Sequence, residues 1–133
     1  MKTGEDSLTN ELVAHALEMA EAAYAPYSRF RVGAAVRAAS GRIFGGANVE
    51  NASYGATICA ERAAIVAAVN AGERKLTALA VTAPPCGVCR QVMREFCDPK
   101  EFTVSIAKSA DSYETFTLDE LLPKSFGPES IGA

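Results

Sequence analysis

Three cysteines and one glutamate have the residue types and spacing of a catalytic metal site. Cys86 and Cys89 are three positions apart, so on the first turn of a helix they share a face and can bind one ion. Cys59 begins another predicted helix and can supply a third ligand. Helix N-termini stabilise thiolate over thiol, which favours metal binding at neutral pH. Three protein ligands leave one tetrahedral position open, which is typical of a catalytic rather than a structural zinc.

Glu61 lies two residues after Cys59 and can face the open coordination position. A carboxylate there can take a proton from metal-bound water and pass it on. Glutamate is also favoured in a first helical turn by the helix dipole alone, but the three neighbouring cysteines favour the catalytic interpretation. Three thiolates on Zn²⁺ leave a net charge of about −1, so nearby cations would help. Arg62 and Arg90 each follow a site residue and are candidates to donate to the sulfurs; the alternative is a solvated arginine on a helix surface.

Cys97, the fourth cysteine, tests whether the zinc site is structural. In a helix that continues through Cys89, it would lie about 12 Å further along the axis. We therefore expect Cys97 to be a packed or partly exposed free thiol. Two other readings of the cysteines stay open, a thiol-redox site and a small zinc-binding module. A redox motif has no need of Cys59 and Glu61, and an acidic chain without a basic run argues against a nucleic-acid finger.

Composition limits the classes of partner. The chain has 133 residues and a net charge of −3, which predicts one domain over residues 1–133 and argues against a polynucleotide partner. Its longest apolar run, residues 63–69, is far short of the roughly 20 residues of a membrane-spanning helix. The first six residues do not resemble a signal peptide, so we expect a cytoplasmic protein with no membrane partner.

The elements that must position the site alternate between helix and strand. Residues 7–24 have helical periodicity, and residues 32–38 and 42–49 predict a hairpin. The alanine-rich segment 58–70 predicts a helix buried in the middle of the domain. Further elements are predicted in this order: a strand at 76–82, a helix at 86–96, a strand at 102–107 and a helical turn at 118–122. The fold class is therefore α/β, a three-layer α/β/α sandwich around a mixed, mostly parallel sheet of about five strands.

Five blocks of sequence carry a family resemblance. Cys59-Ala60-Glu61 followed by Pro85-Cys86-Gly87-Val88-Cys89 matches the general zinc-deaminase signature. When the other blocks are included, residues from about Tyr24 to Gly127 of this sequence resemble the small homotetrameric cytidine deaminases. The blocks stand in family order at residues 25–35, 48–55, 59–62, 85–92 and 121–127.

The resemblance implies a role for each matching residue. Cys59, Cys86 and Cys89 would hold one zinc ion per chain, Glu61 would be the proton shuttle, and Arg62 would hydrogen-bond the sulfurs. The implied substrate contacts are stacking on the pyrimidine by Phe30, hydrogen bonds to the ribose from Asn48 and Glu50, backbone contacts to the base at Ala60, and pocket lining across subunit contacts by Tyr54 and Phe126. Residues two apart on a strand share a face, which suits Asn48 and Glu50 to one sugar. The alternative for Tyr54 and Phe126 is ordinary packing in the core or at an interface.

The resemblance implies hydrolytic deamination of cytidine and 2'-deoxycytidine in pyrimidine salvage, by a homotetramer. Three alternatives stay open. One is a deaminase of a modified cytosine nucleoside such as blasticidin S, another a polynucleotide deaminase, which the charge disfavours, and the last a non-enzymatic zinc-binding module. The chain departs from the family at the short loop of residues 82–85, where many relatives have a longer one, and at Arg31 and Ala47. The loop bears on a subunit contact or the pocket rim rather than on the metal ligands.

Overall fold

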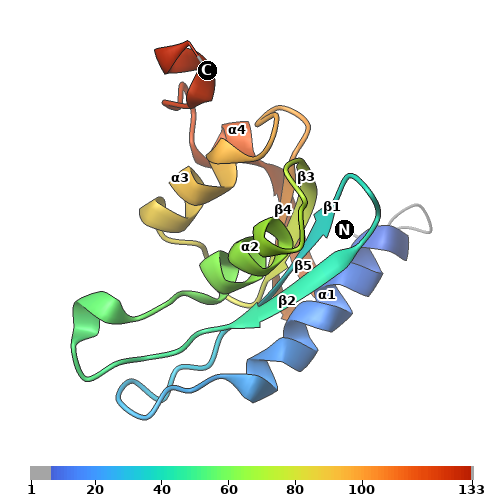
Figure 1. Ribbon diagram of the computed structural model, residues 1–133. Coiled ribbons are helices and arrows are strands. Elements are labelled where there is room, and N and C mark those ends of the chain that lie inside the picture. The colour runs from blue at the N-terminus through green and yellow to red at the C-terminus, as the bar shows by residue number, and fades with distance from the viewer. Residues whose placement is uncertain (1–6, 133) are drawn as a thin grey trace.

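A five-stranded sheet forms the middle of the molecule in the computed structural model, which describes residues 7–132. The strand order is β2-β1-β3-β4-β5. The elements, shown in Figure 1, are α1 (Ser7–Met19), β1 (Gly33–Ala38), β2 (Ile43–Ala47), α2 (Ala60–Asn70), β3 (Leu76–Val81), α3 (Gly87–Glu95), β4 (Thr103–Ser109), β5 (Ser112–Thr117) and α4 (Leu118–Leu121), with short 3₁₀ turns at Ala20–Ala22, Tyr54–Ala56 and Pro128–Ile131. No helix in this part of the chain is long and apolar enough to cross a membrane.

The mixed sheet is confirmed, but the prediction that it is mostly parallel is wrong. Strands β3 and β4 pair in parallel, whereas β1 pairs antiparallel with both β2 and β3, and β4 pairs antiparallel with β5. The physical reason is that α2 connects β2 to β3, but β3 lies beside β1 in the sheet. The two strands joined by this crossover are therefore not neighbours. Strand β5, a polar edge strand that no sequence pattern indicated, adds another antiparallel pair.

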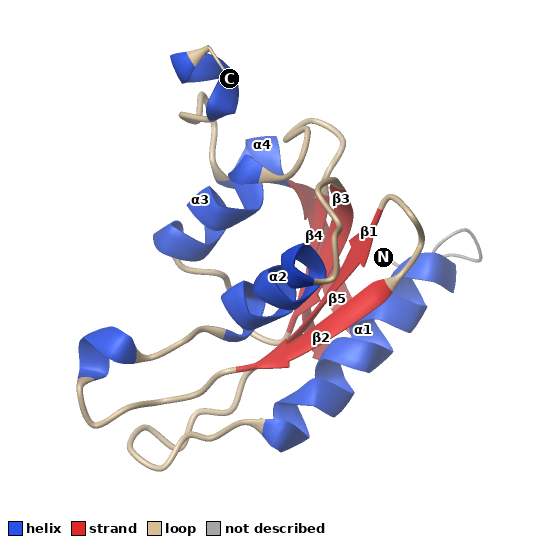
Figure 2. Ribbon diagram, in the orientation of Figure 1, coloured by secondary structure: helices blue, strands red, loops and turns tan. Residues whose placement is uncertain are grey.

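Helices cover both faces of the sheet, as predicted (Figure 2). Helix α1 packs Leu12, Val13 and Ala16 against one face. Helices α2 and α3 lie on the other face, over the larger part of the core. The expectation that α2 is buried in the middle of the domain is wrong for the single chain: Ile65 is fully buried, but Val66 is 51% exposed. The small alanine side chains of α2 let the helix pack closely against the sheet on one side, and the opposite side of the helix is exposed.

A glycine sets the position of α2 on the sheet. A Cβ atom at Gly46 of β2 would come within 2.5 Å of the backbone nitrogen of Ala64 and 2.6 Å of the carbonyl oxygen of Ala60. Any larger residue would therefore push the helix away from the sheet. Because Ala60 is the first residue of α2, this contact fixes the N-terminal end of the helix, where Cys59 and Glu61 lie.

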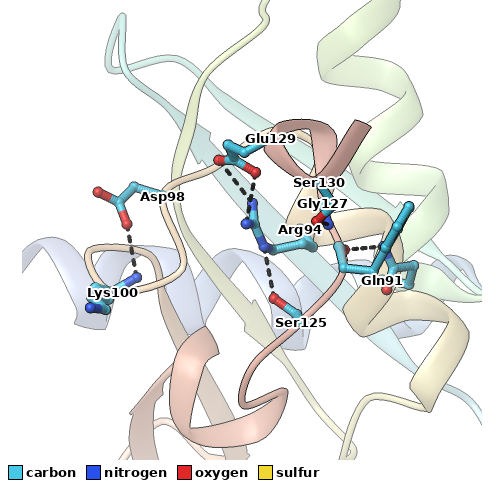
Figure 3. A network of polar contacts seen from close by, with 9 residues as sticks. Gln91, Arg94, Asp98, Lys100, Ser125, Gly127, Glu129 and Ser130 are labelled. Atoms are coloured by element: carbon cyan, nitrogen blue, oxygen red, sulfur yellow. Dashed lines mark hydrogen bonds and ion pairs between the residues drawn. The ribbon is translucent and has the colours of Figure 1, made fainter. Parts of the chain in front are cut away.

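The C-terminal tail is fastened to α3 by a buried arginine, as Figure 3 shows. The guanidinium of Arg94 donates to Ser125 Oγ at 2.8 Å and to the Glu129 carboxylate at 2.8 Å. Gly127 lies directly over this guanidinium, because a Cβ atom there would come within 2.5 Å of Arg94 Cζ. The tail therefore has a defined place beside α3 although it contributes little to the apolar core.

Candidate functional site

The cysteines predicted as metal ligands meet at the N-termini of two neighbouring helices. Cys59 is the N-cap residue of α2, and Cys86 is the N-cap residue of α3, where its sulfur accepts a hydrogen bond from the Cys89 amide. The three Sγ atoms all lie within 4.8 Å of one another. The predicted convergence of the two helix ends is therefore confirmed.

This cluster fits a zinc ion. Tetrahedral coordination with Zn–S bonds of about 2.3 Å separates the sulfurs by about 3.8 Å, which is within the observed spacing. Burial raises the pKa of the Cys86 thiol, but hydrogen bonds with the backbone and side chain of Cys89, and weaker ones with Val88 and Cys59, together outweigh burial, so the net pKa is lowered. Burial and the nearby Glu61 carboxylate raise the pKa of Cys89. A bound cation would offset the charge of the thiolates, and the donor set of three sulfurs suits zinc.

Glu61 lies beside the cysteines and is almost completely buried, with 4% of its surface exposed. It lines one cavity together with Cys59 and Cys86. Burial raises the pKa of the carboxyl group, although the charge of Arg62 and a hydrogen bond with Cys89 act in the opposite direction. A carboxyl group with a raised pKa holds a proton more readily than an ordinary glutamate, which suits a group that takes up and passes on protons.

The two arginines proposed as donors to sulfur have different surroundings. Arg62 Nη2 lies 3.4 Å from Cys59 Sγ and 3.4 Å from the carbonyl oxygen of Thr57, so it is placed as predicted. Arg90 is placed differently: its Nε donates to the carbonyl oxygen of Pro85 at 2.9 Å and its Nη1 to that of Leu121 at 2.7 Å. In the structure these two bonds of the Arg90 side chain go to carbonyl oxygens rather than to the cysteine sulfurs. Arg90 ties the loop before α3 to the end of α4, and both acceptors are backbone groups.

A cavity of about 170 Å³ opens onto the cysteines and Glu61. Phe30 stands at this cavity with 61% of its surface exposed, and Ala60, fully buried, forms part of the wall at the start of α2. Asn48 also lines it. The complete lining is Phe30, Val32, Asn48, Thr57, Cys59, Ala60, Glu61, Ala83, Pro84 and Cys86. The short loop of residues 82–85 thus contributes two wall residues.

Glu50 and Tyr54 line an adjacent cavity of about 270 Å³. Thr57 belongs to the walls of both cavities, so the two are neighbours. Sequence reasoning missed Thr57, and also Tyr27 and Ser28 of the second cavity. The signal that could have found Ser28 is its place two residues before Phe30, within the first of the blocks that resemble the family.

Two aromatic residues with implied pocket roles do not line the cavity of the cysteines within the single chain. Tyr54 is 76% exposed on the loop between β2 and α2, where its ring contacts the Tyr27 ring edge-on at 6.1 Å. Phe126 is 61% exposed on the C-terminal tail beside α3, where its carbonyl oxygen accepts a hydrogen bond from Gln91. Their roles across subunit contacts stay predictions.

The fourth cysteine is free, as expected. Cys97 is half-buried and packs against the core, and burial raises its pKa to about 12. Cys97 is not among the three cysteines whose sulfurs cluster, so it is a free thiol packed outside the candidate metal site.

Comparison with known proteins places this geometry in a family. The cytidine and deoxycytidylate deaminase zinc-binding region matches residues 6–105. The chain is a member of the cytidine deaminase family. A cytidine deaminase of Halalkalibacterium halodurans is 45% identical over 126 residues, which cover 90% of this chain and 95% of that protein. One of Sporosarcina psychrophila is 42% identical over 127 residues, which cover 91% and 93%.

Solved cytidine deaminase structures share the fold. The crystal structure of cytidine deaminase from Burkholderia pseudomallei has a TM-score of 0.82 and 40% identity, and the match covers 94% of this chain and 100% of that one. The structure from Mycobacterium tuberculosis has a TM-score of 0.78 and 41% identity over 90% of this chain and 97% of that one. The cytidine deaminase fold, a mixed five-stranded sheet with helices, is thus confirmed, and membership makes the chain an enzyme of a zinc-binding family whose metal the three clustered cysteines can hold.

Proposed function

We propose that this chain hydrolyses cytidine and 2'-deoxycytidine to the corresponding uridines with release of ammonia, as a step of pyrimidine salvage. One observation carries the proposal. A buried carboxylate, Glu61, and two of three clustered thiols, Cys59 and Cys86, line the same cavity, and an exposed aromatic ring stands at that cavity. This combination provides a hydrolytic centre and a surface for a flat heterocycle in one small space.

Zinc held by Cys59, Cys86 and Cys89 would supply a Lewis acid that lowers the pKa of water to about 7. Glu61 would take the proton from the water that attacks C4 of the base and deliver it to N3. A second proton transfer would place a proton on the exocyclic nitrogen, so that the bond from C4 to that nitrogen breaks and ammonia leaves. The raised pKa of Glu61 supports this role, because the group must hold the proton between the two transfers.

The remaining cavity residues would bind the nucleoside. Phe30 would stack on the pyrimidine, and the backbone at Ala60 would contact the edge of the base. Asn48 and Glu50 would hold the ribose hydroxyls from the two neighbouring cavities. The two neighbouring cavities, of about 170 Å³ and about 270 Å³, support a base subsite beside Phe30 and Ala60 and a sugar subsite between Asn48 and Glu50.

We propose a homotetramer as the active form. Exposed aromatic residues such as Tyr54 and Phe126 support it, because large apolar side chains at 76% and 61% exposure are typical of surfaces that contact another chain. Sedimentation analysis of the zinc-loaded protein tests this proposal. A stable and fully active monomer would contradict it.

The activity is tested by following the ultraviolet absorbance of cytidine after adding purified, zinc-loaded protein. We expect turnover of cytidine and 2'-deoxycytidine, and none of cytosine within an oligonucleotide, because the chain is acidic and its cavity is small. Faster turnover of blasticidin S than of cytidine would replace the proposed substrate with a modified nucleoside. Bound zinc without turnover of any of these would indicate a non-enzymatic module.

A further inference from the structure

The segment before Phe30 is organised around one hydroxyl group. Ser28 Oγ donates a hydrogen bond to Glu50 Oε2 and accepts one from the Phe30 backbone nitrogen at 3.0 Å. These two partners are the residues assigned above to different parts of the nucleoside, Glu50 to the sugar and Phe30 to the base. Ser28 therefore connects the two subsites directly.

Glu50 is already heavily engaged. Its Oε1 atom accepts hydrogen bonds from the backbone nitrogens of Tyr27 at 2.9 Å and Ser28 at 3.1 Å, and its Oε2 atom accepts the Ser28 hydroxyl. An ionised carboxylate accepts about four hydrogen bonds. Glu50 thus keeps capacity for about one more, and the Ser28 hydroxyl determines where on Oε2 that free position points.

The turn that carries Phe30 is held by these contacts. Arg29, between Ser28 and Phe30, has a φ of 63°, a left-handed conformation that side-chain-bearing residues rarely adopt. On the far side of Phe30, the Asn48 side chain donates to the Phe30 carbonyl oxygen at 2.9 Å and accepts from the Val32 nitrogen at 2.9 Å. The Phe30 backbone is therefore held on both sides. Its nitrogen donates to Ser28, which is bonded to Glu50, and its carbonyl oxygen accepts from Asn48.

We propose that Ser28 is a positioning residue which couples the sugar subsite to the base subsite, by fixing the Glu50 carboxylate and the Phe30 backbone in one arrangement. The proposal rests on the nucleoside-binding function proposed above. It assigns Ser28 an effect on substrate affinity through Glu50 and Phe30, rather than contact with the substrate.

The chain contains a matched control. Ser40 Oγ donates to Glu73 Oε2 at 2.8 Å and accepts from the Arg42 backbone nitrogen at 3.3 Å, so it repeats the bonding of Ser28 in the turn between β1 and β2. Ser40 belongs to neither cavity. A general cost of losing such a turn contact therefore appears in Ser40→Ala, whereas an effect on substrate appears in Ser28→Ala alone.

The experiment measures kcat and KM for cytidine with zinc-loaded wild type, Ser28→Ala, Ser28→Thr and Ser40→Ala, after zinc content and thermal midpoint have been recorded for each. We expect KM to rise about tenfold in Ser28→Ala, the size of one lost hydrogen bond to a charged group, with kcat within about twofold. Ser28→Thr keeps the hydroxyl and is expected to stay near wild type, as is Ser40→Ala. If Ser28→Ala does not fold, Ser28→Cys, with its weaker donor, is expected to raise KM in the same direction.

A second readout separates positioning from simple support of the fold. The Ser28 hydrogen bond is the largest cause of the lowered pKa of Glu50, and the other titratable side chains lining its cavity are the phenols of Tyr27 and Tyr54. In Ser28→Ala, the carboxyl titration of Glu50, followed by carbon NMR, should move to higher pH.

Three outcomes are distinguishable. A KM increase together with the upward shift of the Glu50 titration supports the proposal. An unchanged KM and an unchanged titration in Ser28→Ala, in an enzyme that turns over cytidine, overturn it and leave the proposed function intact. Absence of turnover in wild type overturns the proposed function, and the positioning role with it.

Discussion

The metal centre and the nucleoside rim are built in different ways. At the metal centre, Cys89 is fully buried and Glu61 is 4% exposed, and their positions come from helices packed on the sheet. At the rim, Phe30 is 61% exposed and Tyr54 is 76% exposed, and both lie in segments that connect the sheet strands and the α-helices. The centre is therefore complete within one chain, whereas the rim depends on individual hydrogen bonds and on surfaces that a single chain leaves open.

The difference predicts two kinds of variant. A change at the metal centre removes a ligand or the proton carrier and should abolish the reaction. A change at the rim should weaken substrate binding or loosen one segment while the metal stays bound. A variant with the opposite behaviour would break the distinction.

The largest effect is expected for Cys89→Ala. Loss of one of three ligands should lower both zinc content and turnover by more than about a hundredfold, because the remaining two sulfurs hold the ion weakly. Metal analysis and the cytidine assay measure the two quantities. Cys97→Ala is the matched control and should keep both, since Cys97 lies outside the cluster. Full zinc content in Cys89→Ala would remove that residue from the ligand set.

The next largest effect is expected for Arg94, which holds the C-terminal tail beside α3. Arg94→Ala removes the bonds from α3 to Ser125 and Glu129, and we expect the free energy of unfolding in urea to fall by about 2 kcal/mol. Glu129→Gln should have a smaller effect, because the Glu129 side chain is 67% exposed. Proteolysis of the tail should accelerate in Arg94→Ala. Equal stability of the arginine variant and wild type would show that the tail is held by other contacts.

At the rim, Phe30→Ala tests stacking. Stacking of a base on an aromatic side chain is worth about 1–3 kcal/mol, so KM for cytidine should rise by about tenfold or more with zinc content unchanged. Leu8→Ala, which truncates an apolar side chain 62% exposed on α1, is the control and should leave KM at the wild-type value. An unchanged KM in Phe30→Ala would count against stacking.

The smallest effect concerns alkaline pH. Burial raises the pKa of Cys97 to about 12 in the folded chain, against about 8.5 for an unfolded cysteine. The folded state therefore keeps the proton longer, and the stability that this contributes is present below about pH 8.5 and lost as pH rises toward 12. Thermal midpoints of the zinc-loaded protein should decline more steeply above pH 9 in wild type than in Cys97→Ala. Parallel declines would contradict the prediction.

Local spacing was enough to predict the metal centre, because Cys86 and Cys89 share one helical turn and Cys59 begins a neighbouring helix. Contacts between distant segments were not predictable. Asn48 is hydrogen-bonded to Phe30, and Glu50 to Ser28, although the residues of these pairs are 18 and 22 positions apart in the sequence. Strand β5 is not predictable from the sequence pattern, because Ser112–Thr117 is a polar edge strand with no apolar alternation. The exposed face of α2 is not predictable either, because alanine fits both a buried helix and a close contact on one side.

We propose that Glu61 carries the proton in the zinc-dependent deamination of cytidine. The most direct test compares wild type with Glu61→Gln, which keeps the volume of the buried side chain but cannot take up a proton. Zinc content and the absorbance change of cytidine are measured on the same preparations. We expect about one zinc per chain in both proteins, because the chain has one three-cysteine site, and turnover in wild type alone. Substantial turnover by zinc-loaded Glu61→Gln would contradict it.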